Sequence, residues 1–163
     1  MMVIDPSGRG KDETTYAILG VSNGKVLLID WGGFQGEGYS DGVLKALADK
    51  LKTNMVPFCL IEDNFGDGMF SKLFSPVIRK LNHKCAIEDI KATTNKENRI
   101  IDILEPVMNQ HRLVVNREVL RQETYWVFKD KQENTKYSLI YQLTHISRMK
   151  GCLKHDDRLD AVS

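Results

Sequence analysis

Residues 2–31 read MVIDPSGRGKDETTYAILGVSNGKVLLIDW and predict three strands joined by tight turns. The first apolar run ends at Asp5, and a turn rich in proline and glycine follows it. The other two runs have strand length, and the pair Asn23-Gly24 between them is a strong hairpin signal. The stretch therefore predicts a meander that opens a sheet, with strands at residues 2–4, 14–21 and 26–31.

Helical and strand patterns alternate through the rest of the chain. The glycine-rich segment 32–38 reads as a loop, Ser40 is a suitable helix cap, and Pro76 should end or kink its helix. A meander followed by helical crossovers predicts an α/β fold, a mixed five-stranded sheet with helices on both faces, which is the element order of the ribonuclease H-like fold. The predicted elements are helix 41–53, strand 58–61, helix 68–82, strand 86–90, helices 95–109, 116–128 and 136–149, and a last helix starting near Asp156.

The composition is that of an ordinary soluble domain. The 163 residues, 42% hydrophobic and 28% charged, are enough for one domain with one core. The net charge of +1 means that a nucleic-acid surface would have to be a local patch. No apolar run approaches the ~18 residues of a membrane span, and no secretory signal opens the chain. We therefore expect a cytoplasmic protein whose cysteines are reduced thiols: Cys59, Cys85 and Cys152.

Two predicted strands end in a carboxylate, namely Asp5 and Glu62. If these strands are parallel neighbours, a strand spacing of roughly 5 Å puts the two side chains next to each other. Two bare carboxylates at that separation repel, and one would stay protonated. A divalent cation between them removes the conflict, and hard oxygen ligands favour Mg²⁺ or Mn²⁺. Each acid alone also has an ordinary interpretation as a turn or solvated residue.

A third acidic element lies near the end of the chain, in the sequence KHDDRLDA at residues 154–161. On a helix, Asp157 and Asp160 share one face, and so do Asp156 and Asp160. Asp156 has an alternative role as the helix cap, so we predict Asp157 and Asp160 as ligands. Together with the strand acids they could hold two ions about 4 Å apart, the arrangement that cleaves phosphodiesters. The predicted catalytic and metal residues are Asp5, Glu62, Asp157 and Asp160.

Basic residues near these acids are candidates for binding DNA phosphates. Gly8-Arg9-Gly10-Lys11 lacks the glycine and the hydroxyl residue that a phosphate-binding loop requires, so its two cations are assigned to DNA instead. A solvated loop or helix face is the alternative for all of these residues. The candidates are Arg9, Lys11, Lys91, Lys96 and Arg99.

Five segments of the chain form a recognisable set: VIDPSGRGKDET, IEDNFGDGMFSKLFSP, DILEPVMNQHRLVV, KYSLIYQLTHISR and HDDRLDA. Together they resemble the nuclease domain of the terminase large subunit of podovirus-type bacteriophages. Asp5 matches the first catalytic aspartate of that family, Glu62 the acid of its fourth strand, and Asp156-Asp157-x-x-Asp160 its late acidic motif, in which the metal-binding acid varies. The resemblance runs from Val3 to Ala161.

The resemblance implies a ribonuclease H-like endonuclease that cuts concatemeric double-stranded viral DNA during packaging in the host bacterial cytoplasm. It implies a preceding ATPase motor domain in a longer protein, with the small subunit and portal as partners. Residues 1–163 would then be one excised nuclease domain, in keeping with ends that fall inside predicted elements. The last helix is expected to be short and frayed, with poorly held acids. The alternatives are a non-catalytic DNA-docking module and an actin-like ATPase, although the ATPase would need a second phosphate loop that the sequence lacks.

Overall fold

The computed structural model describes residues 1–7, 13–36, 38–62, 68–91 and 96–163. Six strands in these ranges form one mixed sheet in the order β5-β4-β1-β2-β3-β6. β1 pairs antiparallel with β2 and parallel with β4, so the meander and the crossover strands share one sheet, as predicted. The strands are β1 (Met2–Asp5), β2 (Thr14–Ser22), β3 (Lys25–Phe34), β4 (Phe58–Glu62), β5 (Ala86–Ile90) and β6 (Leu113–Val115).

The sheet has six strands rather than the predicted five. β6 has only three residues and pairs parallel with β3 from Val26 to Leu28. A run of three apolar residues directly after a helix carries no period of its own, so the sequence pattern did not separate it from the neighbouring elements. β6 lies at the edge of the sheet, next to β3, and the five predicted strands keep their places.

β3 also continues through the glycines that were predicted to be a loop. The hairpin turn is as expected, with positive φ values of 50° at Asn23 and 73° at Gly24. Gly32 and Gly33, however, lie inside the paired part of β3. A side chain at Gly32 would come within 3.2 Å of the Tyr16 ring, so this glycine allows close packing rather than a turn.

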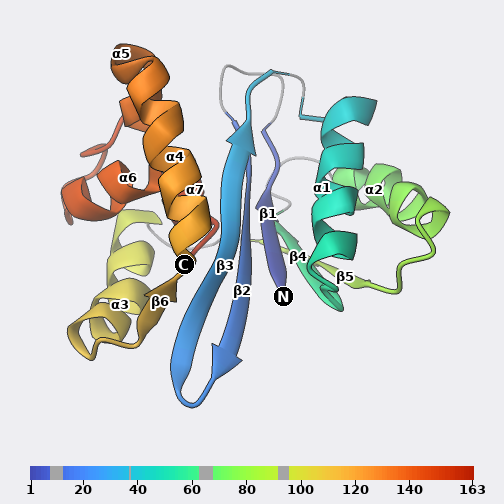
Figure 1. Ribbon diagram of the computed structural model, residues 1–163, viewed down its shortest axis with the longest axis horizontal. Coiled ribbons are helices and arrows are strands. Elements are labelled where there is room, and N and C mark those ends of the chain that lie inside the picture. Colours follow the sequence, from blue (N-terminus) through green and yellow to red (C-terminus); the bar gives the residue numbers. More distant parts are fainter. Residues whose placement is uncertain (8–12, 37, 63–67, 92–95) are drawn as a thin grey trace.

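Helices cover both faces of the sheet (Figure 1). One face carries α1 (Asp41–Thr53) and α2 (Met69–Lys80), packed on the alternate β1 residues Met2 and Ile4. The other face carries the remaining helices, over a second core that includes Trp31. They are α3 (Lys96–Asn109), α4 (Arg117–Lys129), α5 (Lys131–Asn134), the 3-10 turn Thr135–Tyr137, α6 (Leu139–His145) and α7 (Asp157–Asp160).

Two predicted helices contain details that the structure settles, and one of them has different bounds. Pro76 lies inside α2 without ending it. The helix predicted for residues 136–149 is a 3-10 turn followed by α6, which ends at His145. Within the described ranges, no helix is long and apolar enough to cross a membrane. The three cysteines are free thiols, with Cys59 buried and the other two half-buried.

Candidate metal centre

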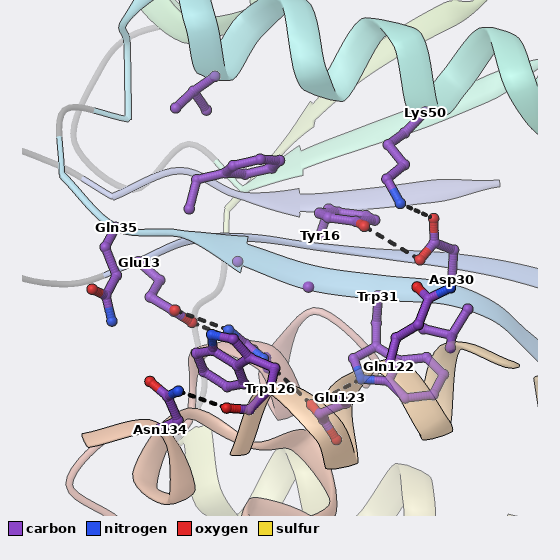
Figure 2. Close-up of a pocket in the computed structure, with 16 residues that line it drawn as sticks. Glu13, Tyr16, Asp30, Trp31, Gln35, Lys50, Gln122, Glu123, Trp126 and Asn134 are labelled. Carbon is purple, nitrogen blue, oxygen red and sulfur yellow. Dashed lines mark hydrogen bonds and ion pairs between the residues drawn. The ribbon is translucent and has the colours of Figure 1, made fainter. Parts of the chain in front are cut away.

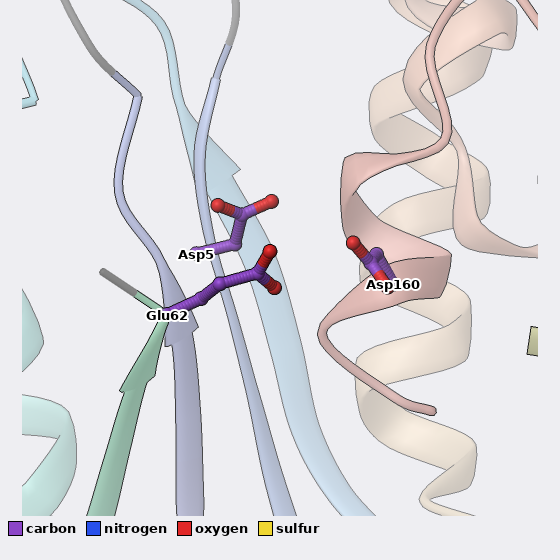
Figure 3. A group of neighbouring side chains, drawn as sticks. All are labelled: Asp5, Glu62 and Asp160. Carbon is purple, nitrogen blue, oxygen red and sulfur yellow. The ribbon is translucent and has the colours of Figure 1, made fainter. Parts of the chain in front are cut away.

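Asp5 and Glu62 end two neighbouring parallel strands. Ile4 lies opposite Ile61 in the β1–β4 ladder, so the next residue on each strand reaches the same sheet edge. Ile4 and Ile61 point into the core under α1 and α2. Because side chains alternate along a strand, Asp5 and Glu62 point to the opposite face, where α3 and α7 lie. Figure 3 shows the two carboxylates side by side.

α7 brings a third carboxylate to this pair. Asp5, Glu62 and Asp160 each offer an oxygen, and these oxygens lie within 4.8 Å of one another (Figure 3). The side chain of Asp160 is only 1% exposed. Three convergent carboxylates, drawn from two rigid strands and one buried helix, are the hard-oxygen donor set that Mg²⁺ and Mn²⁺ prefer. The residues present therefore fit the predicted cofactor.

α7 is short, as expected, but it is not poorly held. Leu159 is fully buried in the second core, and its backbone N–H donates to Oε1 of Gln142 at 2.9 Å. Arg158 donates from Nε and Nη2 to the two carboxylate oxygens of Glu13, at 2.8 and 2.9 Å. The Thr15 hydroxyl donates to the backbone carbonyl of Asp157 at 3.0 Å. The expectation of a frayed helix was therefore wrong, because side-chain contacts with distant residues hold α7 in place although it is short.

Glu123 on α4 extends this anchor into a buried network. Its carboxylate accepts from Nη1 of Arg158 at 3.3 Å and from the Trp31 indole N–H at 3.1 Å (Figure 2). The same side chain accepts from the Leu139 backbone N–H at 2.9 Å. Buried charges of this kind are stable when they are paired and hydrogen-bonded. The network ties α4, α6, α7 and the sheet into one unit behind the acids.

Burial and mutual repulsion raise the pKa of the acids. The pKa of Asp5 rises to about 8, first because of burial and then because of Glu62. Burial also raises the pKa of Asp160, and the nearby cations Lys96 and Arg99 only partly offset that increase. The metal-free site therefore keeps a proton near neutral pH, and a divalent cation would replace that proton.

Lys96 and Arg99, which are also predicted to bind DNA, lie against the acids. Nζ of Lys96 is 2.8 Å from Asp156, 3.3 Å from Asp157 and 3.2 Å from Asp160. Arg99 forms an ion pair with Asp160, and its Nη2 lies 4.0 Å from Glu62. Burial alone would lower the pKa of Lys96, but the three aspartates raise it above its ordinary range. Both cations are therefore charged partners of the site.

Among the other candidate site residues, Asp156 and Asp157 lie near the three convergent carboxylates. Asp157 is not one of the three convergent carboxylates, but it pairs with Lys96 and contributes to the raised pKa of Asp5. Asp156 occupies the N-cap position of α7 without a capping hydrogen bond from its side chain. Lys91 is exposed just after β5. Arg9 and Lys11 lie outside the described residues.

The sequence reasoning missed the anchoring residues Glu13, Glu123 and Arg158. They are far apart in the chain, since Arg158 comes 145 positions after Glu13, and no local spacing links them. A signal for Glu13 was its position directly before β2, because the first residues of that strand are buried. That signal alone does not identify a partner.

A pocket of about 550 Å³ opens between α1 and α4, beside the part of β3 that β6 does not cover (Figure 2). Its walls include Trp31, Trp126 and the ion pair between Lys50 and Asp30, whose atoms lie 2.7 Å apart. None of the three convergent carboxylates lines it. The pocket is therefore separate from the acidic site.

Similarity to known proteins agrees with this architecture. Residues 4–113 match the family described as "Terminase Bacteriophage T7, Ribonuclease H-like domain". The chain is 52% identical over 163 residues to the terminase large subunit of Enterobacteria phage T3, covering 99% of this chain and 27% of that protein's length. A solved human cytomegalovirus terminase nuclease domain, Mn soaked and inhibitor bound, is 13% identical with a TM-score of 0.60, over 99% of this chain and 78% of that one. The predicted ribonuclease H-like fold is thereby confirmed.

Proposed function

The chain belongs to the ribonuclease H-like domain family of the bacteriophage T7 terminase, and from this we propose that it is a divalent-metal-dependent endonuclease for double-stranded DNA. The observation that carries the proposal is the convergence of Asp5, Glu62 and Asp160 within 4.8 Å. The DNA would be the concatemeric product of viral replication, cut during genome packaging. The reaction is hydrolysis of a phosphodiester bond.

Each element of the site has a part in that reaction. Asp5 and Glu62 would bind the ions from rigid strands, and Asp160 would close the site from α7. Asp157, one turn earlier on α7, is the candidate fourth ligand for a pair of ions. When bound, Mg²⁺ or Mn²⁺ supplies activation of the attacking water and stabilisation of the leaving oxygen. The raised pKa of Asp5 means that the carboxyl group has to release a proton as it takes up that role.

The ordered anchor behind α7 supports this assignment. Metal sites depend on ligands held in place by surrounding contacts. The Arg158–Glu13 pair and the burial of Leu159 restrict α7, and therefore Asp160, relative to the sheet. Carboxylates with strongly raised pKa values cluster at functional sites, which favours a catalytic role for Asp5 over a purely structural one.

The proposed setting follows from family membership. The chain spans 27% of the length of its phage T3 relative. We propose that residues 1–163 form the nuclease domain of a terminase large subunit that also contains an ATPase motor domain. Its partners would be the terminase small subunit and the portal, in the cytoplasm of an infected bacterium.

The test is digestion of supercoiled plasmid with Mg²⁺, with Mn²⁺ and with excess chelator in parallel. We expect metal-dependent nicking and linearisation with little sequence preference, and none with Asp5→Asn. Cleavage that persists undiminished in chelator would contradict the proposal. DNA binding without cleavage under any metal condition would instead favour a docking module.

A further inference from the structure

Lys96 and Arg99, at the start of α3, each form an ion pair with one carboxylate oxygen of Asp160. Arg99 pairs with Oδ1 of Asp160, and Nζ of Lys96 lies 3.2 Å from Oδ2 of the same carboxylate. Residues three positions apart share one face of a helix, so both side chains project from α3 into the site. Lys96 also bridges to Asp156 and Asp157. The cations therefore join α3 to α7 across the acids.

The charges of the site explain why the cations are there. Asp5, Glu62 and the three aspartates of residues 156–160 are carboxyl groups gathered in one partly buried region. Without counter-charges, several of them would have to stay protonated or move apart. The side chains of Lys96 and Arg99 are only 32% and 22% exposed, so their attraction to the acids is weakly screened by water.

The same contacts conflict with metal binding. An ion bound to Asp160 would sit close to the ammonium of Lys96 and the guanidinium of Arg99, and like charges repel strongly where water is largely excluded. Nε of Arg99 is buried and has no hydrogen-bond partner among the described residues. Part of the guanidinium is therefore left unsatisfied, which favours its release when another cation arrives.

We propose that Lys96 and Arg99 are internal counter-cations, positioning residues that hold Asp160 in the metal-free protein and are displaced when the divalent ions bind. The inference rests on the proposed function, because it concerns the same metal site. It gives these two side chains opposite effects on two measurable quantities. They stabilise the metal-free fold, and they weaken the binding of the ions.

The test compares Lys96→Met with the wild-type protein, without DNA. Mn²⁺ affinity is measured by titration calorimetry and thermal stability is measured in chelator. We expect Mn²⁺ to bind about tenfold more tightly to Lys96→Met, because one competing charge is gone, and the melting temperature in chelator to fall. Lys96→Arg keeps the charge and should retain the wild-type values of both. Lys154→Met is the matched control, since Lys154 is exposed two residues before Asp156, and it should change affinity less than twofold.

The outcomes separate this inference from the proposed function. If wild type binds Mn²⁺ and Lys96→Met binds it equally or more weakly, the counter-cation role is wrong while the metal site stands. If Mn²⁺ binds only to Lys96→Met, competition is supported directly. If neither protein binds Mn²⁺ although both are folded by circular dichroism, the metal site itself is refuted, and the inference with it. If Lys96→Met does not fold, Lys96→Gln is titrated with Mn²⁺ instead, because glutamine removes the charge but keeps a hydrogen-bond donor for the aspartates. A Mn²⁺ affinity equal to that of the wild type then overturns the inference.

Discussion

Arg158 and Glu13 form a two-point ion pair, with donor–acceptor distances of 2.8 and 2.9 Å, between the last short helix and the residue that leads into β2. Their side chains are only 6% and 2% exposed. Removing one partner of such a pair leaves a buried charge uncompensated. The pair therefore ties Arg158, two residues before Asp160, to the start of β2.

Arg158→Met should destabilise the protein by about 3–5 kcal/mol, because Glu13 and Glu123 lose their counter-charge. Thermal unfolding in chelator measures this loss. The double change Glu13→Gln, Arg158→Met should recover part of it, since one stranded charge is removed. Arg121→Met is the control, because its pair with Glu118 is exposed and 3.9 Å long, and it should cost less than about 1 kcal/mol. Equal effects of Arg158→Met and Arg121→Met would show that the buried pair has no special role.

Gly33→Ala should disturb the same anchor without changing any charge. A Cβ at this position would overlap the Glu13 carboxylate and lie 3.2 Å from Nε of Arg158. Since both side chains are fixed by their ion pair, we expect a loss of about 1–3 kcal/mol. Gly42→Ala is the matched control, because Gly42 lies in α1 with open space around it, and helix propensity predicts a gain of about 0.5–1 kcal/mol. Chemical denaturation of the two variants checks the difference, and a neutral Gly33→Ala would mean that the anchor can shift.

Asp5→Asn should abolish cleavage and stabilise the metal-free protein in a pH-dependent way. The pKa of Asp5 rises from 3.8 to about 8 in the folded protein, so the folded state binds a proton that the unfolded chain releases. Wild-type stability therefore falls as pH rises through that window. The variant lacks this dependence, so its advantage should be small at pH 4 and on the order of 5 kcal/mol at pH 8, at about 1.4 kcal/mol for each unit of pKa shift. Unfolding in chelator across this range tests the sign, and an advantage largest at pH 4 would rule the assignment out.

The three aspartates near α7 should differ in their effects on Mn²⁺ binding. Asp160→Asn should remove most of the affinity, because Asp160 is one of the three convergent carboxylates. Asp157→Asn should weaken binding by about 10-fold, because Asp157 is the candidate fourth ligand and lies outside the three convergent carboxylates. Asp156→Asn should have the smallest effect. Titration calorimetry ranks the three, and a larger loss for Asp157→Asn than for Asp160→Asn would assign the first ligand role to Asp157.

Charge removal at the residues predicted to bind DNA should weaken binding independently of DNA sequence. Replacing Arg9, Lys11 or Lys91 by alanine should reduce the salt dependence of the binding constant by about one unit of slope for each residue that binds a phosphate. Lys96 and Arg99 should contribute to this slope only when the divalent ions have displaced them from the acids. Fluorescence anisotropy with a short duplex, across a series of salt concentrations, measures the slopes. An unchanged slope for a variant places that residue off the DNA path.

Local patterns in the chain were sufficient for most of the sheet and for the two strand acids of the site. Apolar runs of strand length placed Asp5 and Glu62 at strand ends, because the position of a strand along the chain follows from short-range patterns. The same patterns could not detect β6, whose three residues depend on β3 for their pairing. They also assigned Gly32 and Gly33 to a loop, since a glycine required for close packing has the same local signature as a glycine required for a turn.

The placement of α7 depended on contacts between distant parts of the chain. A four-residue helix has little stability of its own, so its order comes from Leu159 in the core and from the pair of Arg158 with Glu13, 145 positions away. The sequence showed that Lys96 and Arg99 are cations near the acidic residues' candidate site. It did not show that their side chains contact the acids. Whether a basic side chain faces solvent or a buried carboxylate is set by the desolvation and pairing of both groups, which exist only once the chain is folded.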